Sequence, residues 1–221
     1  MKTVVFDLDG TLADTSADLI AAANACFEAR GLGPLLDKEL DKSTAFRGGR
    51  AMLTLGYSRL ERSDLAELVE SDYPRLLSFY GEHIDNETFF YPGAVSAVER
   101  LRSNGFKTSI CTNKPEGLAR TLMSRLGASD LFDALIGADT LPVRKPNPTP
   151  LFEAVSRSGG VVDRSVLIGD TETDEKTARA AGVPLVLVGF GPEGDAVKRL
   201  NPDHILNDYK DLQAVVEALI A

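Results

Sequence analysis

The sequence predicts an α/β fold, a doubly wound parallel sheet with an inserted block of α-helices. From residue 94 onward, short apolar runs alternate with amphipathic helical stretches, which is typical of a parallel sheet with helices on both faces. Before that point, one short apolar run is followed by a long stretch with helical spacing and no strand signal. The length of 221 residues suits one core domain with a modest insertion.

The first strand and the inserted helices come first along the chain. Thr3–Phe6 is a short apolar run of the kind that forms a buried strand. We expect Ser16 to be the N-cap of the next helix and Gly31 to end that helix. From residue 37 to about residue 84 the apolar residues keep helical spacing, so we expect helices throughout this region.

The pattern changes after Tyr91-Pro92-Gly93, where strands and helices begin to alternate. The domain prediction follows from that change: residues 1–14 and 90–221 form the α/β core domain, and residues 15–89 form a helical cap domain. We expect the segments near residues 12–15 and 85–91 to act as hinges. The expected strands are 107–111, 134–137, 165–168, 185–188 and 204–206, and the expected helices are 94–103, 115–126, 149–158, 173–181 and 212–220.

Composition and charge exclude several classes of function. The formal net charge is −9 and there is no basic stripe, so we expect no nucleic-acid partner and no anionic membrane surface. No signal peptide is expected, and the longest late apolar run, residues 183–188, is too short to cross a bilayer. We therefore expect a cytoplasmic protein. Cys26 and Cys111 lack metal-ligand spacing, and we expect them to be buried reduced thiols.

Two neighbouring acids, Asp7 and Asp9, follow the first strand. If the strand continued, alternate residues would share a face and both carboxylates would project together. If it breaks at Gly10, Asp7 lies at the carboxyl end of the strand and Asp9 lies in the loop beyond. Two carboxylates this close repel each other unless a cation lies between them or one holds a proton. The pair therefore predicts a Mg²⁺ site or acid–base chemistry.

Other polar residues follow later strands of the predicted sheet. Open parallel sheets bind ligands at the carboxyl ends of their strands. Taken singly, each of these residues has an ordinary explanation as a turn residue or a solvated loop residue. Taken together, they predict one site at one edge of the sheet. In chain order they are Thr112 and Asn113, then Lys145, then Asp170 and Asp174.

A site rich in carboxylates suits Mg²⁺ and phosphoryl transfer. Oxygen ligands favour Mg²⁺ over zinc, and no cluster of His and Cys competes in the sequence. Asp7 with an ordinary pKa is ionised at neutral pH, so it can attack phosphorus and form an aspartyl-phosphate. Asp9 can protonate the leaving oxygen and later deprotonate the attacking water. The phosphoryl oxygens would be bound by Thr112, Asn113 and Lys145.

Four motifs follow one another along the chain: Asp7-Leu8-Asp9-Gly10-Thr11, Cys111-Thr112-Asn113, Lys145-Pro146 and Gly169-Asp170-Thr171-Glu172-Thr173-Asp174. In this order they resemble the motifs of the haloacid dehalogenase (HAD) superfamily. Within that superfamily, the chain is similar to the phosphoglycolate phosphatase group, which carries a helical cap between the first two motifs. The resemblance implies a Rossmann-like catalytic core and a phosphoric monoester hydrolase, and it allows a monomer or a homodimer.

The resemblance also implies a role for each matched residue. Asp7 would be the nucleophile and Asp9 the acid–base residue. Mg²⁺ would be bound by the Asp7 carboxylate, the Asp9 backbone carbonyl and Asp170. Asp174 would either bind the metal directly or contact the residues that bind it. Phosphate would be held by Thr112 and Lys145, with Asn113 beside them.

The most unusual stretch of the predicted cap is Phe46-Arg47-Gly48-Gly49-Arg50. Two glycines let the backbone approach a ligand closely, and arginine suits a carboxylate or a phosphate. We therefore expect Arg47 to bind the substrate, a small phosphorylated metabolite for which 2-phosphoglycolate is the first candidate. An exposed loop with solvated arginines is the competing interpretation.

Two other functions stay open. A sugar phosphomutase of the beta-phosphoglucomutase type would use the same motifs, although mutases of the family often carry an apolar residue where this chain has Thr11. A non-catalytic binding module on the same scaffold is less expected, because Asp7, Asp9, Lys145 and Asp170 are all present.

Overall fold

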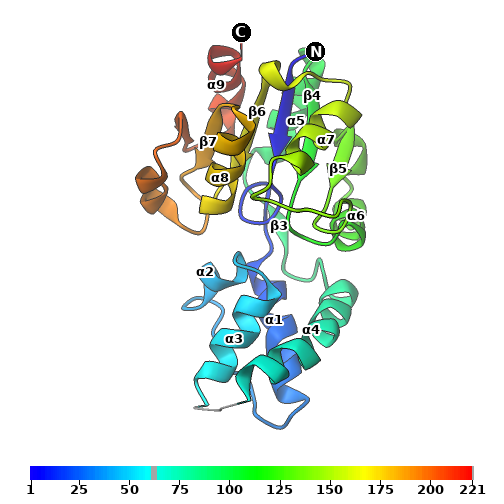
Figure 1. The fold of residues 1–221 in the computed structure, drawn as a ribbon, viewed down its shortest axis with the longest axis vertical. Coiled ribbons are helices and arrows are strands. Elements are labelled where there is room, and N and C mark those ends of the chain that lie inside the picture. The colour runs from blue at the N-terminus through cyan, green and yellow to red at the C-terminus, as the bar shows by residue number, and fades with distance from the viewer. Residues whose placement is uncertain (61–63, 221) are drawn as a thin grey trace. The chain divides into compact units, whose positions relative to one another are not determined.

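The computed structural model describes residues 1–60 and 64–220, and the contacts divide the chain into two units (Figure 1). We call Met1–Ala13 with Phe90–Ala221 the α/β unit, and Asp14–Phe89 the helical unit. The chain passes from one unit to the other within two short strands that pair with each other, β2 (Ala13–Asp14) and β3 (Phe89–Phe90). The assignment of the helical unit as a cap stays a prediction.

The α/β unit is built on a parallel sheet that has six strands in the described residues, in the order β5-β4-β1-β6-β7-β8. Each strand that the sequence predicts for this sheet is present. Because β1 pairs with β4 on one side and β6 on the other, the residues that follow these three strands meet. The strands are β1 (Thr3–Phe6), β4 (Lys107–Cys111), β5 (Ala134–Ile136), β6 (Ser165–Gly169), β7 (Leu185–Val188) and β8 (His204–Leu206).

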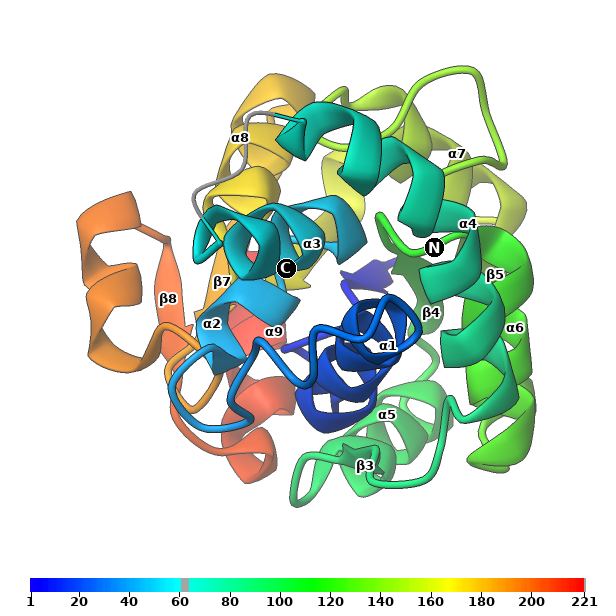
Figure 2. The same cartoon turned by 90° about the horizontal axis from the view of Figure 1, so that it is seen from below.

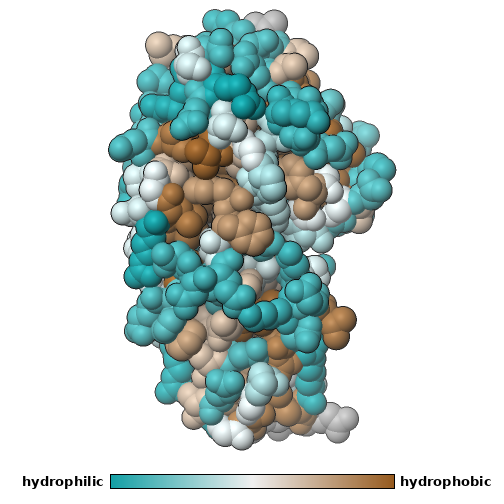
Figure 3. Space-filling view, turned by 180° about the vertical axis from the view of Figure 1, so that it is seen from behind, coloured by the Kyte–Doolittle hydropathy of each residue, from teal (hydrophilic) through white to brown (hydrophobic). Residues whose placement is uncertain are grey.

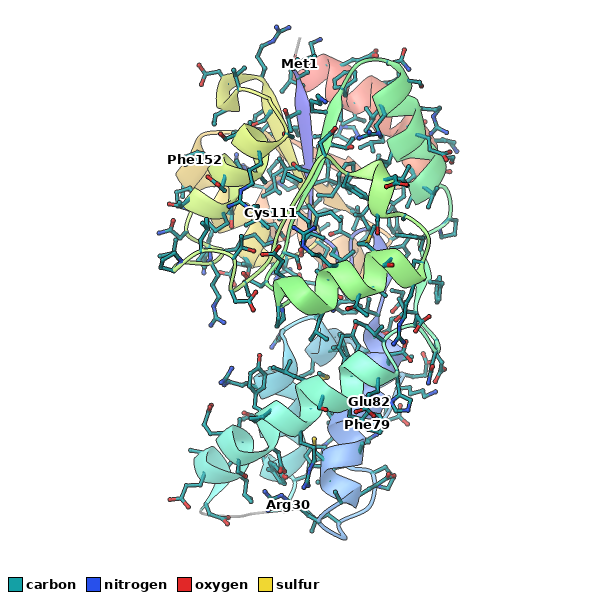
Figure 4. The ribbon with its side chains drawn as sticks, turned by 90° about the vertical axis from the view of Figure 1, so that its right-hand side faces the viewer. Met1, Arg30, Phe79, Glu82, Cys111 and Phe152 are labelled. Carbon is teal, nitrogen blue, oxygen red and sulfur yellow. The ribbon has the colours of Figure 1, made fainter. Side chains whose placement is uncertain are left out.

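Helices cover both faces of this sheet, as a doubly wound fold requires. Helices α7 and α8 pack on one face, and α5 and α9 lie on the other (Figure 4). Under α7, Val5 and Leu167 stand side by side in register and pack with Leu151. The helices are α5 (Ala94–Ser103), α6 (Glu116–Arg125), α7 (Thr149–Arg157), α8 (Glu172–Ala181) and α9 (Leu212–Leu219), and the short 3-10 helices are η1 (Ser129–Leu131), η2 (Val162–Arg164), η3 (Gly194–Leu200) and η4 (Tyr209–Asp211).

The helical unit confirms that residues 37–60 and 64–84 are mainly helical but divides them into separate helices (Figure 2). Residues 61–63 of the predicted region lie outside the described residues. The packing of the helical unit depends on close contact between α1 and α3. The rings of Phe27 and Tyr57 meet edge to face with centroids 4.9 Å apart. Gly56 makes room for this contact, since a Cβ there would lie 2.2 Å from the Phe27 ring. The helices are α1 (Ser16–Glu28), α2 (Lys42–Ala45), α3 (Gly49–Ser58) and α4 (Leu65–Glu82).

The structure corrects some element boundaries. The N-cap of α1 is Thr15, not Ser16, and Ser16 is the first helical residue. The reason is that Asp14 lies just ahead and its Oδ1 accepts hydrogen bonds from both the backbone N and the Oγ of Ser16, at 3.1 and 2.6 Å. Helix α1 ends at Glu28, and Gly31 follows with a φ of +74°.

Two further sequence expectations concern the thiols and membrane-spanning segments. Cys26 and Cys111 are buried and free, as predicted, and burial raises the pKa of Cys111 to about 12 (Figure 4). Within residues 1–60 and 64–220, none of the helices has the length and apolar character needed to span a membrane. The face shown in Figure 3 is largely hydrophilic, with separate hydrophobic patches between the polar residues.

Candidate active site

The first acidic pair lies where β1 gives way to a tight loop. Strand β1 ends at Phe6, and the backbone N of Asp7 still donates to Ile168 O of β6, at 2.8 Å. The loop then closes on itself, since the backbone N of Gly10 donates to Ala13 O at 2.9 Å. Asp7 is therefore at the carboxyl end of the strand and Asp9 is in the loop, which is the second of the two arrangements that the sequence allowed.

Three acids converge: Asp7 and Asp170 come from the loops after β1 and β6, and Asp174 comes from the first turn of α8. Carboxylate oxygens of Asp7, Asp170 and Asp174 all lie within 4.8 Å of one another. Asp170 and Asp174 are fully buried. Burial raises the pKa of Asp7 to about 6, with further upward contributions from Asp174 and Asp9 and an opposing one from Lys145. Burial, with Asp174 and Asp7 adding to it, raises the pKa of Asp170 well above its usual range.

Lys145 is the cation that lies among these acids. Its Nζ is 2.6 Å from Asp174 Oδ1 and 3.0 Å from Asp7 Oδ1, and the residue is 3% exposed. Burial opposes its charge, but the carboxylates of Asp174 and Asp7 hold the pKa of Lys145 well above its usual range. The lysine therefore stays charged and offsets part of the negative charge of the cluster.

Both carboxylate oxygens of Asp174 accept hydrogen bonds from other residues of the protein. Its Oδ1 accepts from Lys145, and its Oδ2 accepts from the backbone N and the Oγ1 of Thr171, at 3.1 and 2.8 Å. The bond from the Thr171 backbone N is one half of the capping box that starts α8. Gly169 allows this approach, because a Cβ there would lie 2.4 Å from Asp174 Cγ. Asp174 thus joins the start of a helix to the lysine of the site.

Two carboxylate oxygens of the acidic cluster, Asp170 Oδ2 and Asp7 Oδ1, are not satisfied by hydrogen bonds from residues 1–60 and 64–220. Asp170 Oδ1 accepts from Thr11 Oγ1 at 2.8 Å. Among the described residues, Asp170 Oδ2 is a buried side-chain atom without a hydrogen-bond partner, and Asp7 Oδ1 has only its ion pair with Lys145, at 3.0 Å. A buried polar atom without a partner is costly, and hard carboxylate oxygens suit an oxygen-seeking divalent cation. This acidic cluster fits a metal ion of that kind.

Asp9 has a partner that the sequence interpretation missed. Lys114 Nζ lies 2.6 Å from Asp9 Oδ1, and the lysine side chain is 4% exposed. Lys114 follows Thr112 and Asn113 in the same loop, so its place after β4 was the available signal. Thr112 Oγ1 accepts from the backbone N of Lys114 at 3.1 Å, and Asn113 Nδ2 donates to Lys145 O at 3.0 Å.

The residues predicted for the α/β unit lie in the loops that follow β1, β4, β5 and β6, except Asp174, which lies in the first turn of α8. Arg47, the remaining predicted site residue, lies exposed in the helical unit. In the part of the chain that the structure describes, its side chain makes no ion pair or hydrogen bond. Arg50, by contrast, pairs with Glu70 at 2.7 Å and lies over the ring of Tyr73. A substrate-binding role for Arg47 stays a prediction.

Comparison with known proteins gives consistent matches. The family model for haloacid dehalogenase-like hydrolases matches residues 4–188. The phosphoglycolate phosphatase of Caulobacter vibrioides is 37% identical over 210 residues, covering 95% of this chain and 88% of the relative. That of Mesorhizobium japonicum is 36% identical, covering 95% and 92%. A crystal structure from Lactobacillus delbrueckii subsp. bulgaricus matches with a TM-score of 0.83 at 28% identity, covering 100% of both chains.

Proposed function

Because the chain belongs to the haloacid dehalogenase-like hydrolase family and is a phosphoric monoester hydrolase, we propose that it hydrolyses 2-phosphoglycolate with Mg²⁺. The reaction would proceed through an aspartyl-phosphate on Asp7. One observation carries this proposal: among the described residues, Asp170 Oδ2 is buried without a hydrogen-bond partner, and Asp7 Oδ1 beside it has only the Lys145 ammonium, at 3.0 Å. The curated relatives named phosphoglycolate phosphatase support the choice of substrate.

The metal would be held by Asp7 and Asp170, with the Asp9 backbone carbonyl added by the family resemblance. Bound there, Mg²⁺ would polarise the phosphoryl oxygens and offset their negative charge. We expect Asp174 not to bind the metal directly, because both of its carboxylate oxygens already accept hydrogen bonds from Lys145 and Thr171. Its role would be to hold the lysine and the loop in place.

In the first step, a carboxylate oxygen of Asp7 attacks phosphorus and the bond from phosphorus to the ester oxygen breaks. Asp9 gives its proton to that oxygen, so the product leaves as an alcohol, which is glycolate for this substrate. Lys145 and Thr112 bind the phosphoryl oxygens, where charge spreads in the transition state. Asn113 supports them, because its amide donates to the Lys145 carbonyl.

In the second step, Asp9 takes a proton from water and the water oxygen attacks the phosphorus of the aspartyl-phosphate. The bond to Asp7 breaks, inorganic phosphate leaves, and Asp7 is again a carboxylate. Lys114 would orient Asp9 for both steps, since its Nζ lies 2.6 Å from Asp9 Oδ1. The site then returns to its starting protonation.

The helical unit would act as the cap, with Arg47 binding the carboxylate of the substrate. This deepens the substrate proposal, because a carboxylate is the group that separates 2-phosphoglycolate from neutral phosphate esters. The alternative of a sugar phosphomutase has less support, since the curated relatives are named as phosphatases. A cytoplasmic location and a monomeric or dimeric state remain predictions.

The experiment is a comparison of phosphate release from 2-phosphoglycolate, glucose 1-phosphate and an aryl phosphate, with Mg²⁺ and with EDTA. We expect 2-phosphoglycolate to give the highest kcat/KM and EDTA to abolish turnover. Asp7→Asn should lower kcat roughly a thousand-fold or more, because the nucleophile is lost. Asp130→Asn, at an exposed aspartate in η1, is the matched control and should keep full activity.

Unchanged activity in Asp7→Asn would rule out Asp7 as the nucleophile. Equal kcat/KM for all three esters would rule out the substrate assignment while leaving the phosphatase chemistry intact. For the cap, Arg47→Ala should raise KM for 2-phosphoglycolate but not for the aryl phosphate, which carries no carboxylate. The same KM for 2-phosphoglycolate in that variant would dismiss Arg47.

A further inference from the structure

We propose that Tyr209 is a positioning residue for the metal site, acting through Thr11 on Asp170; this inference rests on the metal site of the proposed function. Tyr209 begins η4, far from the motifs in sequence, and it lies beyond residues 4–188, which the family model matches. It is fully buried, and its hydroxyl donates to the Thr11 carbonyl at 2.7 Å.

The hydrogen bond from Tyr209 ends on the residue that orients Asp170. Thr11 accepts from Tyr209 through its backbone carbonyl and donates through its Oγ1 to Asp170 Oδ1, at 2.8 Å. That second bond occupies one oxygen of Asp170 and leaves Oδ2, which has no hydrogen-bond partner in the described part of the chain. The position of Thr11 therefore decides which oxygen of Asp170 is available to a cation.

Tyr209 is itself held firmly. Its ring lies 5.3 Å from the ring of Phe190, whose ring lies 5.1 Å from that of Tyr91, measured between centroids. On the other side, the Tyr209 Cβ lies 3.3 Å from where a Cβ on Gly93 would be. Arg100 Nη2 donates to the Tyr209 carbonyl at 3.3 Å. A side chain with these neighbours has little freedom, so its hydroxyl fixes the Thr11 carbonyl in place.

The loop that carries Phe190 supports the same part of the site. A Cβ added to Gly191 would lie 2.9 Å from the Gly10 carbonyl oxygen and 3.4 Å from Asp170 Cβ. The backbone at Gly191 therefore packs against both the loop after β1 and the acid after β6. Gly191 and Tyr209 together fix the positions of Thr11 and Asp170 relative to each other.

The test measures Mg²⁺ binding to the metal-free protein by isothermal titration calorimetry. Tyr209→Phe keeps the ring and removes only the hydroxyl, so we expect folded protein with a Kd for Mg²⁺ raised about 3- to 10-fold. Tyr57→Phe is the matched control, since Tyr57 is also fully buried and its hydroxyl donates to Asp72 within the helical unit. This control should lower thermal stability but leave the Kd unchanged.

A double-mutant cycle tests the path through Thr11. Thr11→Val removes the hydrogen bond to Asp170, and in that background Tyr209→Phe should have no further effect on the Kd. An unchanged Kd in Tyr209→Phe overturns the inference, as does equal weakening by Tyr57→Phe or full additivity in the cycle. Absence of Mg²⁺ binding to the unmodified protein overturns the metal proposal as well, so the two failures are distinguishable.

Discussion

At the scale of single residues, Lys145 is the side chain on which the charge balance of the site depends. It lies within 3.0 Å of Asp7 and 2.6 Å of Asp174, in surroundings where its side chain is only 2% exposed. An ion pair of this kind gains little net free energy compared with apolar side chains of the same volume. Removing one partner is different, because it leaves buried acids without compensation.

We predict that Lys145→Met destabilises the metal-free protein at pH 7 by about 3 kcal/mol or more, because several buried carboxylates lose their cation. Urea unfolding with and without Mg²⁺ measures the effect, and Mg²⁺ should restore part of the lost stability. Lys176→Met is the control, since the pair of Lys176 with Glu172 is exposed and should show no measurable change. Equal unfolding curves for Lys145→Met and the unmodified protein would contradict the prediction.

The motif residues, Thr11 among them, could be read from the sequence, but the distant contacts that support the site could not. Asp7 and Asp9 stand out because two acids end an apolar run, whatever the rest of the chain does. Lys114, Thr11 and Tyr209 act on partners 105, 159 and 198 positions away in the sequence. No local pattern gives such distances, because they depend on the order of the strands and the path of the loops.

At the scale of the elements, one buried carboxylate joins three helices of the helical unit. Asp72 on α4 accepts two hydrogen bonds from Arg30, just after α1, at 2.7 and 2.9 Å, and a third from Tyr57 on α3. Figure 4 labels Arg30. Burial alone would raise the pKa of Asp72, but the hydrogen bonds from Arg30 and Tyr57 outweigh it and hold that pKa below its usual range.

The sign of the pH dependence follows from that depressed pKa. The stabilisation is fully present above the pKa of an unfolded aspartate and is lost as the pH falls through the lower pKa of the folded state. We predict that Asp72→Asn costs about 2 kcal/mol or more at pH 7, and that its difference from the unmodified protein shrinks below about pH 4. Urea unfolding at pH 7 and pH 3 measures both values. A difference that stays constant across this range would show that the charge of Asp72 contributes nothing.

The elements themselves were largely predictable. The strands of the main sheet are apolar runs bounded by turn residues, and they appear where the sequence predicts them. Strands β2 and β3 were not predicted, because two residues are too few to show any periodicity. Thr171 was overlooked as a helix start, since its capping box uses Asp174, an acid interpreted as part of the site.

At the scale of the whole molecule, the one acidic cluster found to fit a cation among residues 1–60 and 64–220 belongs to the α/β unit. Mg²⁺ should therefore stabilise that unit, by about 2.7 kcal/mol when its concentration is a hundred times the Kd. We predict slower hydrogen exchange in β1, β4 and β6 on adding Mg²⁺ at constant ionic strength, with little change in α1, α3 and α4. Asp170→Asn should abolish the effect. Equal slowing throughout both units would contradict the prediction and show that they unfold together.

For the molecule as a whole, the sequence predicts the fold class but not the order of the strands. The alternation of strands and helices fixes the fold class, because parallel strands need helical crossovers. It does not fix the order of the strands, which depends on how each crossover turns back. That order brings the ends of β1, β4 and β6 together, so the geometry of the site became visible only with the sheet.

The central place of β1 in its sheet has a consequence for synthesis on the ribosome. Strand β1 is made before its neighbour β6, and β4, β5 and α7 are made between them. Until β6 is made, one edge of β1 has unsatisfied amide and carbonyl groups, which invite pairing with other nascent chains. A fragment that ends before β6 lacks Asp170 and Asp174 and exposes one edge of β1. We expect such a fragment to aggregate and to be degraded.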